Sequence, residues 1–199
     1  MKTLALELST SRGSLAWLDG EIEFTREWPN DRKNSAVFFE NLQELRRKFG
    51  APETIIVGLG PGSYAGTRIA ISAAIGIQRS CDARLIGYPS ICAMECDVQE
   101  YCVIGDARRK SFFFARIIKN AVIESPTLFS ELELNARLDS LNPATPVFSS
   151  ELLPQFHQPM IWFPSALILA RLANEPRRSF FLPPLEPIYL REPHITMQK

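Results

Sequence analysis

A glycine-rich segment between an apolar run and a long helical pattern is the feature that most limits how this chain can fold. The segment reads VGLGPGSYAGTR from Val57 to Arg68. It follows the strand-like run Thr54–Val57 and precedes helical spacing that continues to about Arg79. A strand, a glycine turn and a helix in succession are typical of an α/β protein. Such a turn leaves backbone N–H groups at the positive end of the helix, which favours an anion.

No known phosphate or nucleophile motif fits this segment completely. A P-loop requires Gly-Lys-Ser/Thr, and Gly66-Thr67-Arg68 lacks the lysine. The dinucleotide fingerprint requires a third glycine where Ser63 stands. A hydrolase elbow around Ser63 requires glycines at the positions of Pro61 and Ala65. We therefore expect no catalytic residue in this segment.

The composition indicates a globular protein without a strong charge of its own. In 199 residues the 22 lysines and arginines equal the 22 aspartates and glutamates, so we expect any contact with RNA to run through a partner. No apolar run approaches the ~20 residues of a membrane span, and Glu7 interrupts any signal peptide. Reduced thiols and a cytoplasmic location are the simplest expectation for the four cysteines.

Metal ligands are sparse in this sequence. Cys92 and Cys96 can share a helix face, but two ligands do not make a closed metal site. The two histidines, His157 and His194, lie in proline-rich and terminal sequence, away from the first predicted helix. We expect no metal site and assign both histidines to surface or packing positions.

Hydrophobic periodicity predicts two units, residues 1–99 and residues 100–199. The first unit reads βββαβαβα, and the second is a hairpin with a less regular, proline-rich remainder. The expected elements of the first unit are strands Lys2–Leu8, Ser14–Leu18 and Glu21–Trp28, helix Ala36–Phe49, strand Thr54–Leu59, helix Ser63–Arg79, strand Arg84–Tyr88 and short helix Pro89–Val98. Those of the second are strands Cys102–Asp106, Phe112–Ile118 and Asn120–Glu124, helix Ser165–Ala173 and a closing strand Ile188–Leu190.

Four segments in order resemble the TsaB (YeaZ) family of bacterial tRNA threonylcarbamoyladenosine biosynthesis proteins. They are Lys2–Ser11 (KTLALELSTS), Gly60–Ile69 (GPGSYAGTRI), Gly105–Arg108 (GDAR) and Pro187–Arg191 (PIYLR). The glycine segment is the most specific of the four, and together they cover nearly the whole chain. Two positions depart from the family pattern: Glu7 replaces the usual aspartate, and Asn34 replaces a frequent histidine.

The resemblance implies an actin, sugar-kinase and Hsp70-type (ASKHA) fold of two RNase-H-like lobes, with the second lobe reduced. It implies a non-catalytic partner of the paralogue TsaD, which acts with the ATPase TsaE to modify adenosine 37 of tRNA. It also implies a TsaD heterodimer through a helical bundle, and a homodimer when the protein is isolated.

Two helices carry the residues that we expect at that interface. In the first, Phe38, Leu42 and Leu45 share a face. In the second, small side chains recur at three- and four-residue steps and let another helix approach closely. The second set is Gly66, Ala70, Ala73, Ala74 and Ile77. The alternative is that both faces only pack on their own sheet.

The alternative function is a small ATP-binding phosphotransferase or ATPase of the same fold. It requires Glu7 and Asp106 to face each other across a cleft that holds Mg-nucleotide. Asp106 and Arg108 have another interpretation: they close a hairpin turn, in which the aspartate side chain hydrogen-bonds the nearby backbone. A weak or vestigial ATP or ADP site would be made by Ser9, Thr10, Ser11, Gly60, Gly62, Ser63 and Asp106. Arg68 has two equal interpretations: it anchors loop carbonyls or reaches a partner carboxylate.

Overall fold

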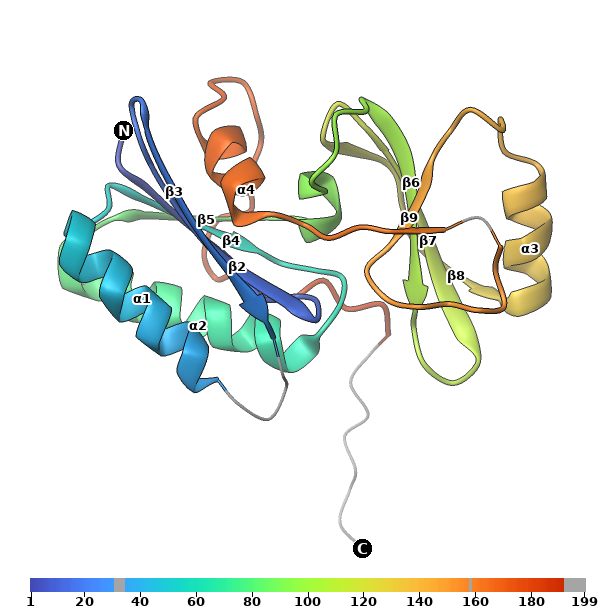
Figure 1. The fold of residues 1–199 in the computed structure, drawn as a ribbon, viewed down its shortest axis with the longest axis horizontal. Coiled ribbons are helices and arrows are strands. Elements are labelled where there is room, and N and C mark those ends of the chain that lie inside the picture. The colour runs from blue at the N-terminus through green and yellow to red at the C-terminus, as the bar shows by residue number, and fades with distance from the viewer. Residues whose placement is uncertain (31–34, 158, 192–199) are drawn as a thin grey trace, which may run out of the picture.

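The computed structural model describes residues 1–30, 35–157 and 159–191. Two five-stranded sheets lie side by side, each with helices packed on it (Figure 1). The elements in chain order are β1 Thr3–Glu7, β2 Arg12–Asp19, β3 Ile22–Pro29, α1 Ala36–Phe49, β4 Thr54–Gly58, α2 Tyr64–Cys81, β5 Arg84–Tyr88, the short 3₁₀ helix η1 Ser90–Ala93, β6 Glu100–Asp106, β7 Ser111–Ile118, β8 Ala121–Ser130, α3 Glu131–Asp139, β9 Val147–Ser149, β10 Met160–Ile161 and α4 Ala166–Ala173.

The first sheet has the strand order β3-β2-β1-β4-β5. Strands β3, β2 and β1 are antiparallel, whereas β4 and β5 run parallel to β1. Every residue of β1 and β4 is buried, so both faces of the sheet are covered. Leu4 and Leu6 pack with α1 and α2, while Ala5 between them packs with α4 on the opposite face.

The second sheet repeats this arrangement in its order β8-β7-β6-β9-β10. Its first three strands are antiparallel, and β9 runs parallel to β6, as β4 does to β1. Helix α3 packs on β7 and β8. Two lobes with the same strand order confirm the predicted fold class, and the shorter β9 and β10 are consistent with a reduced second lobe.

The chain returns to the first lobe before it ends. Helix α4 packs on β1, β2 and β4. Phe181 then exchanges two backbone hydrogen bonds with Gly87 at the edge strand β5, and the Ile188 amide donates to the Leu59 carbonyl at 2.8 Å. Helix α4, Phe181 and Ile188, which the sequence analysis assigned to the second unit, therefore pack on the first. The expected closing strand Ile188–Leu190 does not form a strand.

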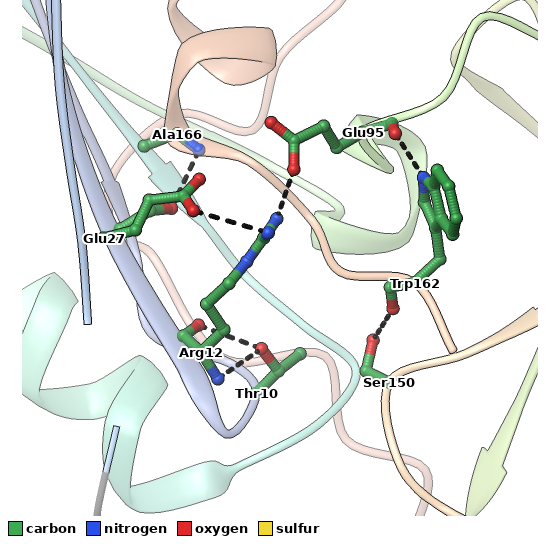
Figure 2. A network of polar contacts seen from close by, with 8 residues as sticks. Thr10, Arg12, Glu27, Glu95, Ser150, Trp162 and Ala166 are labelled. Atoms are coloured by element: carbon green, nitrogen blue, oxygen red, sulfur yellow. Dashed lines mark hydrogen bonds and ion pairs between the residues drawn. The ribbon is translucent and has the colours of Figure 1, made fainter. Parts of the chain in front are cut away.

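Two crossovers join the lobes, and they are hydrogen-bonded to each other. The Glu95 amide donates to the Phe163 carbonyl at 3.0 Å, and the Ser165 amide donates to the Ala93 carbonyl at 2.8 Å. Figure 2 shows the side chain of Arg12, from the start of β2, between Glu27 and Glu95. None of the described helices has both the length and the apolar character needed to span a membrane.

Candidate functional site

A cleft of about 430 Å³ opens between the two lobes. It brings together most of the residues predicted for a weak nucleotide site, although they come from distant parts of the chain. Those that line it are Ser9, Thr10, Ser11, Gly62, Ser63 and Asp106. Gly60 is the member of the predicted set that does not line the cleft. A cleft that joins these residues, which the alternative function requires, is therefore present. Which ligands it can bind depends on the side chains that line it.

The glycine loop is fixed against the turn that follows β1. Gly60 has φ +88°, a left-handed conformation that favours glycine, and its amide donates to the Ser90 hydroxyl at 2.9 Å. The Ser63 amide donates to the Ser9 carbonyl at 2.5 Å. A side chain at Gly62 would lie 2.2 Å from that same carbonyl oxygen, so only glycine fits. The loop therefore closes onto Ser9 and sets the N-terminus of α2 beside it.

Ser63 caps α2, because its hydroxyl accepts a hydrogen bond from the Gly66 amide at 3.3 Å. A Cβ atom at Gly66 would lie 2.1 Å from the carbonyl oxygen of Leu8. Gly66 therefore lets the first turn of α2 approach the end of β1. This close approach is internal to the lobe and explains the glycine by itself, so the assignment of Gly66 to an interface stays a prediction.

Glu7 lies behind the cleft and not in it. Its side chain has no exposed surface, and its Oε1 accepts a hydrogen bond from the Ser9 amide at 2.6 Å. Burial raises the pKa of the Glu7 carboxyl above its ordinary value, although the neighbouring Ser9 and Ser90 hydroxyls act in the opposite direction. Glu7 therefore does not face Asp106 across the cleft, which is the arrangement that the alternative function requires.

Asp106 closes the β6–β7 turn, as one of its two interpretations predicted. Its Oδ1 accepts from the Arg108 amide at 2.6 Å, and its Oδ2 accepts from the Arg108 guanidinium at 3.1 Å. Glu151, which the sequence analysis did not identify, accepts from the Asp106 amide at 2.7 Å. Asp106 still lines the cleft, but its carboxylate is already engaged within its own turn.

An aromatic pair stands at the rim of the cleft. The rings of Tyr64, at the start of α2, and Tyr189, near the end of the described chain, lie 5.4 Å apart, and both are more than two-fifths exposed. Arg68 donates to the Tyr64 hydroxyl at 2.8 Å and lies over its ring. Arg68 is thus an exposed cation held by an aromatic side chain, and no hydrogen bond to a loop carbonyl is among its described contacts.

The apolar faces predicted for partner contact turn inward. Both helices pack these faces on the first sheet, in one cluster with Leu4, Leu6 and Val57. The buried residues of the predicted set are Phe38, Leu42, Leu45, Ala70, Ala74 and Ile77. Ala73 is half-buried beside them. The six buried residues are therefore wrong as interface residues, because the most apolar stripe of each helix covers its own sheet, whereas the interface assignment of Ala73 stays a prediction.

The outward faces of the same two helices carry a second apolar surface. Phe39 of α1 is 49% exposed, and Ile75 of α2 is 41% exposed. Gly76 beside Ile75 has nothing within 4 Å of a Cβ position, so the backbone of α2 is open there. We call Phe39, Ile75 and Gly76 the outer helix face.

No three His, Cys, Asp or Glu side chains in the described parts of the chain form a group that could hold a metal ion. All four cysteines are free thiols, and His157 is exposed. Asn34 and His194, which the sequence analysis discussed, lie outside the described residues.

Two lobes of matching strand order around a cleft define a protein of the actin-like, sugar-kinase type of fold. No family model and no curated protein matches the sequence. Among solved structures, one described as an uncharacterized protein with similarity to peptidase YEAZ from Pseudomonas aeruginosa has a TM-score of 0.73 and 19% identity. The match covers 96% of this chain and 99% of that one.

A second solved structure, YeaZ from Pseudomonas aeruginosa, has a TM-score of 0.68 and 19% identity, over 87% of this chain and 91% of that one. The chain therefore has the YeaZ fold over nearly its whole length, and the predicted resemblance is confirmed for the fold.

Proposed function

We propose that this chain is a non-catalytic, TsaB-type subunit that binds a TsaD-type paralogue and supports threonylcarbamoylation of tRNA adenosine 37. The observation that carries the proposal is the YeaZ fold over nearly the entire chain, combined with the outer helix face. In this proposal the protein acts in the cytoplasm, with TsaE in the larger complex. It contacts tRNA only indirectly and requires no cofactor for binding its partner.

The outer helix face has the chemistry of a helix-packing surface. Phe39 and Ile75 supply apolar area, and the open backbone at Gly76 lets a facing helix approach closely. Exposed Glu40 lies on α1 and exposed Arg79 on α2. In this proposal the same surface pairs two copies of the chain when TsaD is absent.

The test is co-purification with TsaD from the same organism, using Phe39→Glu and Ile75→Arg. Each change places a charge in the centre of the proposed interface, where desolvation is costly. We expect each variant to bind TsaD about tenfold more weakly or worse, and to become monomeric when isolated. Threonylcarbamoyl transfer by the reconstituted complex should fall in parallel.

Ile123→Arg is the matched control, because Ile123 is 61% exposed on β8 in the other lobe. Circular dichroism should show that all three variants remain folded. If the two helix variants bind TsaD as well as Ile123→Arg does, the outer helix face is not the interface. If unaltered protein neither binds TsaD nor increases transfer, the proposed function itself is wrong.

A further inference from the structure

We propose that the outer helix face recognises an acidic partner helix, which presents carboxylates on either side of an apolar stripe. The inference rests on the proposed function and specifies the chemistry of the partner that this surface fits. The partner carboxylates face Arg46 of α1 and Arg68 and Arg79 of α2, and the apolar stripe covers Phe39 and Ile75.

Helix α2 carries positive charge and no negative charge. Its 18 residues, Tyr64–Cys81, include Arg68 and Arg79 but no aspartate or glutamate. Arg68 lies two turns before exposed Ile75 and Arg79 one turn after it, so all three side chains lie on one side of the helix. The two arginines are ~16 Å apart along the helix axis. A partner helix that packs along α2 therefore meets two cations at this spacing.

Arg46, in the last turn of α1, adds a third cation at the same surface. It lies two turns after Phe39, and its guanidinium donates to the Ser80 hydroxyl of α2 at 3.4 Å. Its Nε is buried and has no hydrogen-bond partner among the described residues. Arg46 therefore spans the two helices next to Arg79, and no carboxylate neutralises it there.

These three arginines have no ion pair within the described parts of the chain, although several arginines elsewhere do. Arg171, for example, pairs with Glu23 at 2.8 Å. The acids of α1 do not neutralise the three arginines either. Glu44 is already paired with Arg26 at 3.2 Å, and Glu40 forms no described ion pair with any of them. The positive charge of this surface is therefore left for a partner.

The helix dipole explains a cation at Arg46 and Arg79 but not at Arg68. Arg46 and Arg79 lie in the last turns of their helices, where the partial negative charge stabilises a cation. Arg68 lies in the second turn of α2, near the positive end, where the dipole does not favour a cation. It donates to the Tyr64 hydroxyl at 2.8 Å and lies 5.1 Å from the centre of the Tyr64 ring. Arg68 is therefore an ordered cation, which a partner carboxylate can meet at a small cost in side-chain entropy.

A second copy of the chain fits these charges less well than an acidic partner does. Because α2 contains no acid, two α2 helices packed together place like charges in one interface. A different chain whose helix carries carboxylates about three turns apart meets Arg68 and Arg79 with unlike charges. Charge thus favours the heterodimer over the homodimer at the same apolar surface.

The experiment measures TsaD binding by surface plasmon resonance at low and at high salt, about 50 mM and about 500 mM NaCl. We expect Arg68→Glu and Arg79→Glu each to weaken binding about tenfold or more at low salt, and less at high salt, where charges are screened. Arg177→Glu is the matched control, because Arg177 is exposed after α4 and has no ion pair among the described residues. It should bind TsaD as the unaltered chain does, and circular dichroism should show that all three variants fold.

The outcomes separate this inference from the proposed function. If the unaltered chain binds TsaD equally at both salt concentrations, or if the two α2 variants bind as Arg177→Glu does, the partner is not recognised by its charge and only this inference is overturned. If the unaltered chain does not bind TsaD, both proposals are wrong. A third outcome would assign the surface to a second copy: unaltered chain that binds a double variant, Arg68→Glu with Arg79→Glu, more tightly than it binds TsaD. That result would also overturn the inference.

Discussion

Glu7 is the last residue of β1, and its carboxyl group is fully buried beside Ser9, Gly58 and Ser90. A Cβ atom on Gly58 would lie 1.8 Å from Glu7 Oε2 and 2.6 Å from the Ser90 hydroxyl. The absence of that side chain therefore lets the carboxyl lie beneath the glycine loop. The Ser9 amide donates to Oε1 at 2.6 Å, so Glu7 ties the end of β1 to the turn that lines the cleft.

This burial predicts a pH dependence of stability. Because the folded chain holds the Glu7 proton more tightly than the unfolded chain, the favourable contribution is complete below the unfolded pKa. It is lost as pH rises through the higher folded pKa. Glu7→Gln keeps the acceptor for Ser9 and cannot ionise, so its free energy of unfolding should not show this loss. Urea unfolding across the acidic and neutral range is the measurement.

Glu21→Gln, at an exposed position in the β2–β3 turn, is the matched control for the change of charge. We expect its stability profile to run parallel to that of the unaltered chain. If Glu7→Gln also runs parallel to it, the buried carboxyl does not control the pH dependence of folding.

At this scale the sequence predicted the residues near the glycine loop better than those across the cleft. Ser9, Ser11 and Ser63 were expected in one site, and they do meet, because β1 and β4 are adjacent parallel strands whose carboxyl ends lie at the same edge of the sheet. Glu151 and Tyr189 were not expected as cleft residues. They reach the cleft only through contacts between distant parts of the chain, which no local pattern encodes.

Helix α2 has one side that packs on the first sheet and one side that is exposed. Its two glycines lie on these different sides. Gly66 touches the end of β1, where a Cβ atom would meet a backbone oxygen at 2.1 Å. Gly76 lies in the helix interior on the exposed side, with nothing within 4 Å. Gly66→Ala should therefore destabilise the fold by ~1–3 kcal/mol through overpacking. Gly76→Ala should stabilise it by ~0.5–1 kcal/mol through helix propensity.

Chemical denaturation of the two alanine variants provides the comparison, since each serves as the control for the other. Equal effects of the two substitutions would contradict the assignment of one face inward and one face outward. Gly76→Ala also affects the proposed function, because a methyl group on the outer helix face would hinder close approach by a partner helix while the isolated chain becomes more stable.

The long elements were predicted well, because hydrophobic periodicity dominates them. Helix Ala36–Phe49 has the predicted bounds, and the β1–β3 meander is present. Helix α3 was missed, although Ser130 and Glu133 form a capping box that precedes buried Leu134 and Leu138. Strands β9 and β10 have three and two residues, too few for a period to be visible. Periodicity locates an apolar stripe, but it does not say whether the stripe covers a sheet or a partner.

Two crossovers connect the lobes, and the Arg12 side chain lies where both crossovers pass the first sheet (Figure 2). Its guanidinium donates to Glu95 on the first crossover at 2.7 Å and pairs with Glu27 of β3 at 3.4 Å. It also lies 5.0 Å from the ring centre of Phe163 on the second crossover. The Trp162 indole continues the network by donating to the Glu95 carbonyl. The Arg12 side chain thus contacts the first sheet and both of the crossovers that lead to the second lobe.

Arg12→Met should weaken this brace without unfolding either lobe. The ion pairs are partly exposed and contribute at most ~1 kcal/mol each, and the ring contact contributes ~0.5–1 kcal/mol. We expect a total loss of ~1–2 kcal/mol, smaller at high salt because the pairs in the unaltered chain are then screened. The radius of gyration from X-ray scattering should also increase, since the crossovers lose their shared anchor.

Arg26→Met is the matched control for Arg12→Met. Arg26 has a single ion pair, with Glu44 at 3.2 Å, and like Arg12 one ring contact, with Phe24, but both lie within the first lobe. Its loss should cost less, about 0.5 kcal/mol, and should leave the radius of gyration unchanged. Identical scattering from the two variants would show that the crossovers hold the lobes without Arg12.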